Sequence, residues 1–138
     1  MNYSIIHIKT IEAEQCGRIS FFEGIHDLPF EIRRIYYISG VPEGKMRGFH
    51  AHKTLRQLLF CPYGEIEIIL DNGEEREHIV LNRPDQGILL KSGLWREMLW
   101  KKSDSVLCVA ASDFYDPEDY IRDYDAFLEF RKSGEMYT

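Results

Sequence analysis

The sequence lacks the features of secreted, membrane-spanning and disulfide-stabilised proteins. It has three cysteines, Cys16, Cys61 and Cys108, which are far apart and form no C-x-x-C pattern. We therefore expect reduced thiols in a cytoplasmic protein. The first residues show no cationic segment followed by a long apolar run, so we expect no signal peptide. No apolar stretch approaches the roughly 20 residues that cross a membrane, and we expect no membrane partner.

The chain also lacks an excess of positive charge. Its 17 Lys and Arg residues are outnumbered by 23 Asp and Glu residues, which gives a formal net charge of −6. This balance argues against nucleic acid as a partner and against anionic membrane surfaces. An anionic ligand would need a local cluster of Arg and Lys. With 138 residues, 44% of them apolar, the chain has the size and composition of a single domain over residues 1–138.

Short segments of strand-like composition, separated by Gly, Pro and Asn, predict an all-β fold. The clearest is a hairpin in which Asp71-Asn72-Gly73 supplies the tight turn between two alternating segments. Closely spaced short strands are typical of a barrel or sandwich, which we expect over residues 3 to 113. The predicted strands cover residues 2–9, 18–23, 31–38, 65–70, 74–81, 87–91 and 105–112.

The pattern changes near the C-terminal end. Asp116 precedes Pro117, a pair that suits the start of a helix. The apolar residues that follow recur with helical spacing. We therefore predict a short helix over about residues 117–132 that packs on the barrel or on a second subunit. We expect Tyr115, Tyr120 and Tyr124 to be packing residues.

The strongest functional signal is a histidine pair between two glycines, Gly44 and Gly64. His50 and His52 are two residues apart, so in a strand both side chains project from the same face. Two adjacent imidazoles can bind a metal or transfer protons near neutral pH. The alternatives without function are two unrelated surface histidines or two hydrogen-bonded core histidines.

The spacing G-x5-H-x-H-x4-Q-x6-G resembles the first motif of the cupin superfamily, whose members are small antiparallel β-barrels. The resemblance implies a cupin-type antiparallel β-barrel (jelly roll) with a short C-terminal helix. Gln57 stands where metal-binding cupins carry glutamate, and Arg96 stands where they usually place a third histidine. A guanidinium cannot ligate a metal. We therefore predict no metal and no cofactor, with a zinc or iron cupin as the alternative.

Three stretches, residues 32–38, 47–53 and 111–125, resemble the sugar 3,4-ketoisomerases of dTDP-deoxysugar biosynthesis, the WxcM-like cupins. The resemblance extends from about residue 5 to residue 130. It implies an enzyme that moves the ketone of dTDP-4-oxo-6-deoxyglucose from C4 to C3 through an enediol intermediate, so that an aminotransferase can install a 3-amino group. It also implies a homodimer that needs no metal.

The proton transfers implied by this resemblance fall to the histidine pair. We expect His50 to be the base and His52 to be its partner or the second proton carrier, because a neutral imidazole suits proton abstraction near neutral pH. Gln57 is a further candidate for substrate binding.

A sugar nucleotide also carries a diphosphate, which Arg binds better than Lys because of its forked donors. Arg34 and Tyr36 share one face of a predicted strand and are candidates for the phosphate and for the sugar or nucleotide. For each cation the alternative is an exposed ion pair on the rim of the barrel. The cationic candidates are Arg34, Arg47, Lys53 and Arg96.

One departure from the family pattern concerns stereochemistry. Several relatives read Trp-His-Glu where this chain reads Trp95-Arg96-Glu97. A titratable group is replaced by a fixed cation, which favours a product of gluco configuration at C4.

Two other functions stay open. One is a dTDP-sugar 3,5-epimerase, although those enzymes pair a histidine with an aspartate and no such pair is evident in the sequence. The other is a non-catalytic cupin that binds a nucleotide sugar.

Overall fold

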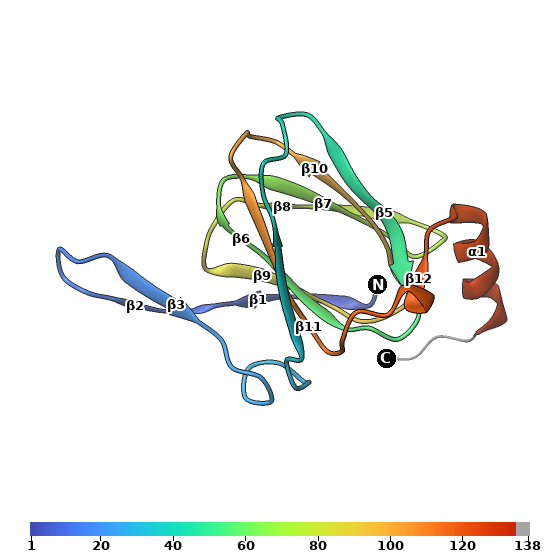
Figure 1. The fold of residues 1–138 in the computed structure, drawn as a ribbon, viewed down its shortest axis with the longest axis horizontal. Coiled ribbons are helices and arrows are strands. Elements are labelled where there is room, and N and C mark those ends of the chain that lie inside the picture. Colours follow the sequence, from blue (N-terminus) through green and yellow to red (C-terminus); the bar gives the residue numbers. More distant parts are fainter. Residues whose placement is uncertain (135–138) are drawn as a thin grey trace.

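The computed structural model describes residues 1–134, which form two antiparallel sheets packed face to face, a projecting hairpin and a C-terminal helix (Figure 1). One sheet has the strand order β1-β9-β6-β11-β4, the other has the order β12-β5-β10-β7-β8, and β2 pairs only with β3. This confirms the predicted all-β, cupin-type fold. The strands are β1 (Tyr3–His7), β2 (Lys9–Glu12), β3 (Arg18–Phe21), β4 (Arg34–Ile38), β5 (Met46–His52), β6 (Gln57–Tyr63), β7 (Ile66–Asp71), β8 (Arg76–Leu81), β9 (Gln86–Leu90), β10 (Trp95–Trp100), β11 (Val106–Ala111) and β12 (Tyr120–Ile121).

The main core lies between the two sheets. Along β7, the alternation of side chains turns Ile66, Ile68 and Leu70 inward, and all three are fully buried. They pack with inward-facing residues of the opposite sheet such as Leu59 and Val109. Burial of these apolar surfaces, at roughly 25 cal/mol per Å², favours the face-to-face arrangement of the sheets.

A second apolar cluster lies on the outer face of the sheet that contains β6 and β11. Leu28 and Phe30, from the loop before β4, are buried there with Leu58 and Ala110. Ile32 packs against the same cluster. The predicted strand over 31–38 therefore starts only at Arg34, because the residues before it cover a sheet face instead of extending a sheet edge.

The C-terminal segment differs from the predicted helix over 117–132. Asp116 does cap a helical turn that begins with Pro117, but the turn is a 3-10 helix that ends at Asp119. Tyr120 and Ile121 then form β12, which pairs with β5. The α-helix α1 covers Tyr124–Ser133, after Asp123 has capped it by accepting a hydrogen bond from Ala126 N at 2.9 Å. The pairing with β5 outweighs the helical periodicity of the sequence.

The helix α1 packs beside β5 and β12, on the side of the molecule opposite the β2–β3 hairpin (Figure 1). Phe127 is fully buried and contacts the rings of Trp95 and Tyr124. Tyr124 also donates a hydrogen bond from its hydroxyl to Asp71 Oδ2 at 2.8 Å. Tyr124 is therefore the packing residue that the sequence predicted. No helix in the described part of the chain is long and apolar enough to cross a membrane.

The two glycines that bound the histidine segment both have backbone conformations that favour glycine. Gly44 has φ of 84° and Gly64 has φ of 100°. Their surroundings differ: a Cβ on Gly44 would meet nothing within 4 Å, whereas a Cβ on Gly64 would lie 2.6 Å from Ser105 Cα. Gly64 therefore needs both the positive φ and the missing side chain.

We predict that Gly64→Ala lowers the free energy of unfolding by several kcal/mol, from about 1–2 kcal/mol of backbone strain plus about 1–3 kcal/mol of overpacking. Gly44→Ala is the matched control and should cost only the backbone term. Urea unfolding followed by circular dichroism measures both. Equal losses for the two variants would contradict this account of Gly64.

Candidate active site

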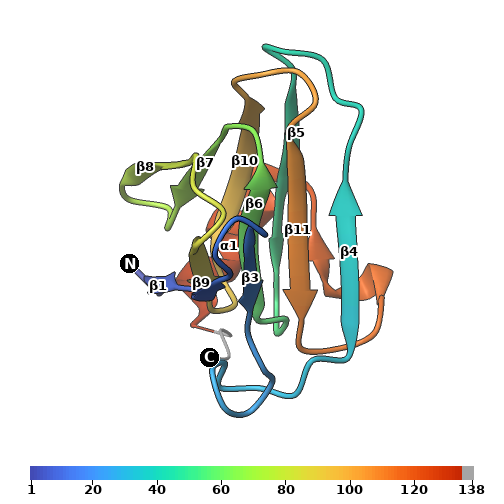
Figure 2. The ribbon, with the colours of Figure 1, turned by 90° about the vertical axis from the view of Figure 1, so that its left-hand side faces the viewer.

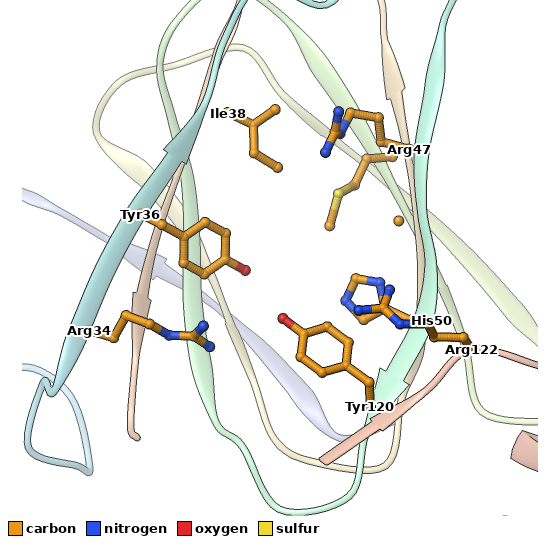
Figure 3. Close-up of a pocket in the computed structure, with 9 residues that line it drawn as sticks. Arg34, Tyr36, Ile38, Arg47, His50, Tyr120 and Arg122 are labelled. Atoms are coloured by element: carbon orange, nitrogen blue, oxygen red, sulfur yellow. The ribbon is translucent and has the colours of Figure 1, made fainter. Parts of the chain in front are cut away.

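A cavity of about 300 Å³ opens between the two sheets. Figure 3 shows its walls: one comes from β4 and the other from β5 and the β12 segment. The hydroxyls of Tyr36 and Tyr120 point toward the middle of the cavity (Figure 3). The lining residues are Arg34, Tyr36, Ile38, Arg47, Gly48, His50, Met98, Tyr120 and Arg122.

An irregularity in β5 determines which of its side chains face the cavity. His50 pairs with Arg96 of β10, but Gly48 pairs with the very next residue, Glu97, so Phe49 is an extra residue in the ladder. Phe49 has φ of 58°, and its side chain is 44% exposed. Because such a bulge shifts the alternation by one residue, Arg47 and His50 both face the cavity. Regular alternation would have placed them on opposite faces.

Gly48 allows this bulge. Its φ is 93°, and a Cβ there would lie 3.0 Å from the carbonyl oxygen of Arg96. The close approach of β5 and β10 at this point therefore depends on glycine.

The two histidines lie together with Tyr120. The ring centroids of His50 and His52 are 5.0 Å apart, and that of Tyr120 is 5.1 Å from His50 and 4.4 Å from His52. His50 lines the cavity, whereas His52 is fully buried behind it. The shared orientation predicted from the H-x-H spacing is therefore present.

His52 has a carboxylate partner. Its Nδ1 lies 3.0 Å from Asp119 Oδ2, and the other oxygen of Asp119 accepts hydrogen bonds from Thr54 N at 2.8 Å and Thr54 Oγ1 at 2.9 Å. Burial alone would raise the pKa of Asp119, but the hydrogen bonds from His52 and Thr54 lower it. An ionised carboxylate must accept from Nδ1–H, so the lone pair of His52 is on Nε2, which is buried with no hydrogen-bond partner among residues 1–134. The expectation that the chain has no histidine–aspartate pair is wrong.

Both imidazoles are neutral at pH 7. Burial and the nearby Arg96 cation lower the pKa of His50 to about 3. Burial also lowers the pKa of His52 to about 4, although the hydrogen bond to Asp119 acts in the opposite direction. Neutral imidazoles can accept protons, and the lowered pKa makes each of them a weaker base than a free imidazole.

Beneath the cavity lies a chain of hydrogen bonds that starts at Arg96. Its guanidinium is 1% exposed and donates to Gln57 Oε1 and to the carbonyl of Leu94. Gln57 Nε2 donates in turn to the Tyr36 hydroxyl at 3.0 Å. Burial lowers the pKa of Arg96 to about 10, which leaves it charged at pH 7. No carboxylate in residues 1–134 forms a salt bridge with it.

The donor set beside the histidines does not fit a divalent metal. The third cupin position is the Arg96 guanidinium, which has no lone pair to offer. The Gln57 oxygen already accepts a hydrogen bond from that guanidinium. Nowhere in residues 1–134 do three His, Cys, Asp or Glu side chains come together as metal ligands.

The structure brings most of the predicted site residues to one place. Arg34, Tyr36, Arg47 and His50 line the cavity. Three others lie immediately behind it: His52, Gln57 and Arg96 are all buried. The buried position of Arg96 means that it cannot hold a phosphate at the cavity mouth. Lys53 does not line the cavity but a neighbouring groove along α1.

Three residues of the site were not predicted: Asp119, Tyr120 and Arg122. All three lie within residues 119–122, in the segment that was predicted to be a helix. In an extended segment, Tyr120 and Arg122 are two residues apart and therefore lie on the same face. Tyr120 packs its ring against both histidines, and it also lines the cavity, which was not predicted. Tyr115 is 59% exposed, and the guanidinium carbon of Arg34 lies over its ring, 5.6 Å from the ring centroid.

The lowered pKa values of the histidines predict a pH-dependent stability. Unfolding returns each imidazole to an ordinary pKa near 6.5, so unfolding takes up protons as the pH falls below that value. Stability should therefore be complete above pH 6.5 and decrease toward pH 4, by up to roughly 1.4 kcal/mol per pH unit for each histidine. Thermal unfolding of the His50→Asn variant between pH 7 and pH 5 should show a shallower slope. The exposed His78→Asn variant is the control; equal slopes in all three proteins would contradict the prediction.

Comparison with known proteins agrees with this geometry. The family profile described as FdtA: WxcM-like, C-terminal matches residues 1–132. A protein of Aneurinibacillus thermoaerophilus, named TDP-4-oxo-6-deoxy-alpha-D-glucose-3,4-oxoisomerase, is 40% identical over 130 residues, which cover 94% of this chain and 93% of that protein.

Two solved structures are similar over nearly their whole length. QdtA, a sugar 3,4-ketoisomerase from Thermoanaerobacterium thermosaccharolyticum in complex with TDP, shares 39% identity and a TM-score of 0.92 over 96% of both chains. WlaRB, a TDP-quinovose 3,4-ketoisomerase from Campylobacter jejuni, shares 42% identity and a TM-score of 0.87 over 93% of this chain and 98% of that one. The chain thus belongs to the FdtA (WxcM-like, C-terminal) family and is a sugar 3,4-ketoisomerase.

Proposed function

We propose that the substrate is TDP-4-keto-6-deoxyglucose and that the enzyme moves its ketone from C4 to C3 by histidine-mediated proton transfer. The observation that carries the proposal is a pair of neutral imidazoles, with His50 lining the cavity and His52 buried directly behind it. Two relatives support the substrate: the Aneurinibacillus protein is named for it, and a histidine-to-asparagine variant of QdtA was crystallised with it. That QdtA structure is 39% identical to this chain, with a TM-score of 0.92.

The chemistry assigns a role to each imidazole. His50 removes the proton from C3, and the electron pair of that bond forms the enediolate with the C4 carbonyl. A proton is then delivered to C4, while the C3 hydroxyl proton passes to the C4 oxygen, so that the C3 oxygen becomes the carbonyl oxygen and the C4 oxygen becomes a hydroxyl. His52, held in one tautomer by Asp119, is the second proton carrier. The aspartate fixes the orientation of the ring and does not itself transfer a proton.

The developing negative charge has nearby stabilising groups. The Arg96 cation lies buried under the cavity, and no carboxylate of residues 1–134 forms a salt bridge with it. Because the surroundings are of low polarity, a cation there acts strongly on an anionic intermediate. The hydroxyls of Tyr36 and Tyr120 face the cavity and can donate hydrogen bonds to the sugar oxygens (Figure 3).

The diphosphate is assigned to three arginines around the cavity: Arg34, Arg47 and Arg122. Arg122 is assigned to the diphosphate instead of Lys53 and Arg96, which were the other predicted candidates. None of the three forms a salt bridge within residues 1–134, and Arg34 Nε is buried without a partner. In a chain of net charge −6, such a cluster of unpaired guanidinium groups is suited to an anionic ligand.

We further propose that the product has the gluco configuration at C4. Arg96 lies where several relatives have a histidine, and a buried guanidinium stays protonated, so it delivers no proton from that side. The identities of two named relatives agree: the chain is 42% identical to a TDP-quinovose 3,4-ketoisomerase and 31% identical to a TDP-fucose-3,4-ketoisomerase, both from Campylobacter jejuni. Quinovose is the gluco and fucose the galacto 6-deoxy sugar.

The alternatives have less support. A 3'-monoepimerase from Streptomyces bikiniensis, ChmJ, shares the fold with a TM-score of 0.74 but only 17% identity. A binding protein without activity does not agree with membership of a family of sugar 3,4-ketoisomerases.

Replacing His50 separates catalysis from binding. We predict that His50→Asn lowers kcat by about 10²–10⁴-fold, as loss of a general base does, while the dissociation constant for TDP barely changes. Nuclear magnetic resonance (NMR) of the product measures the first quantity and titration calorimetry the second. His78→Asn, an exposed histidine of β8 that pairs with Glu67, is the control. Parallel losses of activity and TDP affinity would instead favour a binding role for His50.

We also propose that the enzyme is a homodimer. The β2–β3 hairpin projects from the body of the protein in Figure 1 and points toward the viewer in Figure 2. Ile11 and Ile19 face each other on it with exposures of 60% and 66%. An isolated two-stranded hairpin is at best marginally stable in water, so a second copy is the covering surface that we infer.

Sedimentation should give twice the 16.3 kDa mass of one chain. The double variant Ile11→Lys with Ile19→Lys should shift the protein toward the single-chain mass, because it places two buried charges in the interface. A wild-type protein that sediments as one chain at micromolar concentration would contradict the dimer.

A further inference from the structure

The hydrogen bonds beneath the cavity have only one possible direction. Arg96 carries donors and no acceptor, so the Gln57 side-chain atom that faces it must be the oxygen, Oε1. The orientation of the amide is therefore decided by chemistry, and Nε2 must be the atom that faces Tyr36. Gln57 is fully buried, so water does not compete for either group.

The same reasoning extends to Tyr36. Its hydroxyl oxygen accepts the hydrogen bond from Gln57 Nε2 at 3.0 Å, so its own proton cannot point back along that bond. Within residues 1–134 the Tyr36 hydroxyl makes no other hydrogen bond, and its oxygen faces the open cavity (Figure 3). Burial raises the pKa of Tyr36 above its ordinary value, although the Arg96 cation opposes this, so the hydroxyl keeps its proton at pH 7.

We propose that Gln57 is a positioning residue that, with Arg96 behind it, turns the Tyr36 hydroxyl proton into the cavity as a hydrogen-bond donor to the oxygen that becomes negative during the isomerisation. This inference rests on the proposed reaction and names a group that supports it. The Tyr36 proton is not transferred: it stays on the hydroxyl and its hydrogen bond strengthens as the enediolate forms.

The proposal also gives a physical reason for glutamine at this position. A glutamate there could pair with Arg96, but its carboxylate would have only acceptors to offer Tyr36. The hydroxyl would then donate to the carboxylate and turn its proton away from the cavity. The carboxylate would also neutralise the Arg96 cation under the enediolate. Glutamine retains both the direction of the proton and the unpaired charge.

The Gln57→Glu variant tests this directly, since it has the same size and keeps a partner for Arg96. We expect kcat to fall on the order of 100-fold, as removal of a single such donor does, with KM and TDP affinity nearly unchanged. Tyr36→Phe should have a similar effect. Combined, the two changes should cost less than the sum of their separate losses, because the part of the Gln57→Glu effect that acts through the tyrosine is already lost in Tyr36→Phe. Gln86→Glu, the same substitution at the far end of β9, is the matched control.

A second measurement does not depend on turnover. Tyrosine labelled with ¹³C at Cζ reports the ionisation of Tyr36 by NMR, with the Tyr36→Phe variant to assign the signal. In Gln57→Glu the pKa of Tyr36 should be higher than in the wild type, because the hydroxyl then donates to a carboxylate. This readout keeps the inference testable even if TDP-4-keto-6-deoxyglucose is not converted by the wild-type enzyme, which would overturn the proposed function instead.

Four results would overturn the inference. One is a Gln57→Glu variant with wild-type kcat, and another is an unchanged pKa of Tyr36 in that variant. The third is full additivity of Gln57→Glu and Tyr36→Phe. The fourth is a parallel loss of stability and TDP affinity in Gln57→Glu. Either of the last two would show that Gln57 does not act through the tyrosine hydroxyl.

Discussion

The site depends on one buried cation that forms no salt bridge within residues 1–134. Arg96 is 1% exposed, and its hydrogen bonds in this part of the chain go to the neutral oxygens of Gln57 and Leu94. A buried charge without a counterion is costly to stability. Here it contributes to the neutral state of both histidines, whose pKa values it helps to lower, and it lies where an anionic enediolate would offset its charge. Arg96 stands where metal-binding cupins usually place a third histidine, so this site has a fixed positive charge in place of a metal ligand.

The site also requires that side chains from distant segments of the chain reach one cavity. Irregularities in the strands bring these side chains together. The bulge at Phe49 lets Arg47 and His50 share a face. The short pairing of β12 with β5 brings Tyr120 against both imidazoles and Asp119 against His52. Both features interrupt the regular strand and helix geometry of their segments. They fix the rings and charged groups on the framework of the sheets, so the cavity is organised before the substrate binds.

The sequence alone predicted the parts of the site that follow regular alternation. His50 with His52, and Arg34 with Tyr36, share faces because each pair is two residues apart on a strand. The shared face of Arg47 and His50 was not predictable, since a bulge shifts the phase without a clear compositional signal. Asp119, Tyr120 and Arg122 were missed because their apolar neighbours have helical spacing, and only pairing with β5 makes the segment extended. The burial of Arg96 likewise depends on tertiary packing.

The most direct test of the account follows TDP-4-keto-6-deoxyglucose in D₂O by NMR. If neutral histidines move hydrogen between adjacent carbons of the sugar, the carbonyl signal should pass from C4 to C3 while the proton on C5 is retained. The account would be contradicted by deuterium at C5 with the ketone still at C4, because the cavity would then act on the other side of the carbonyl.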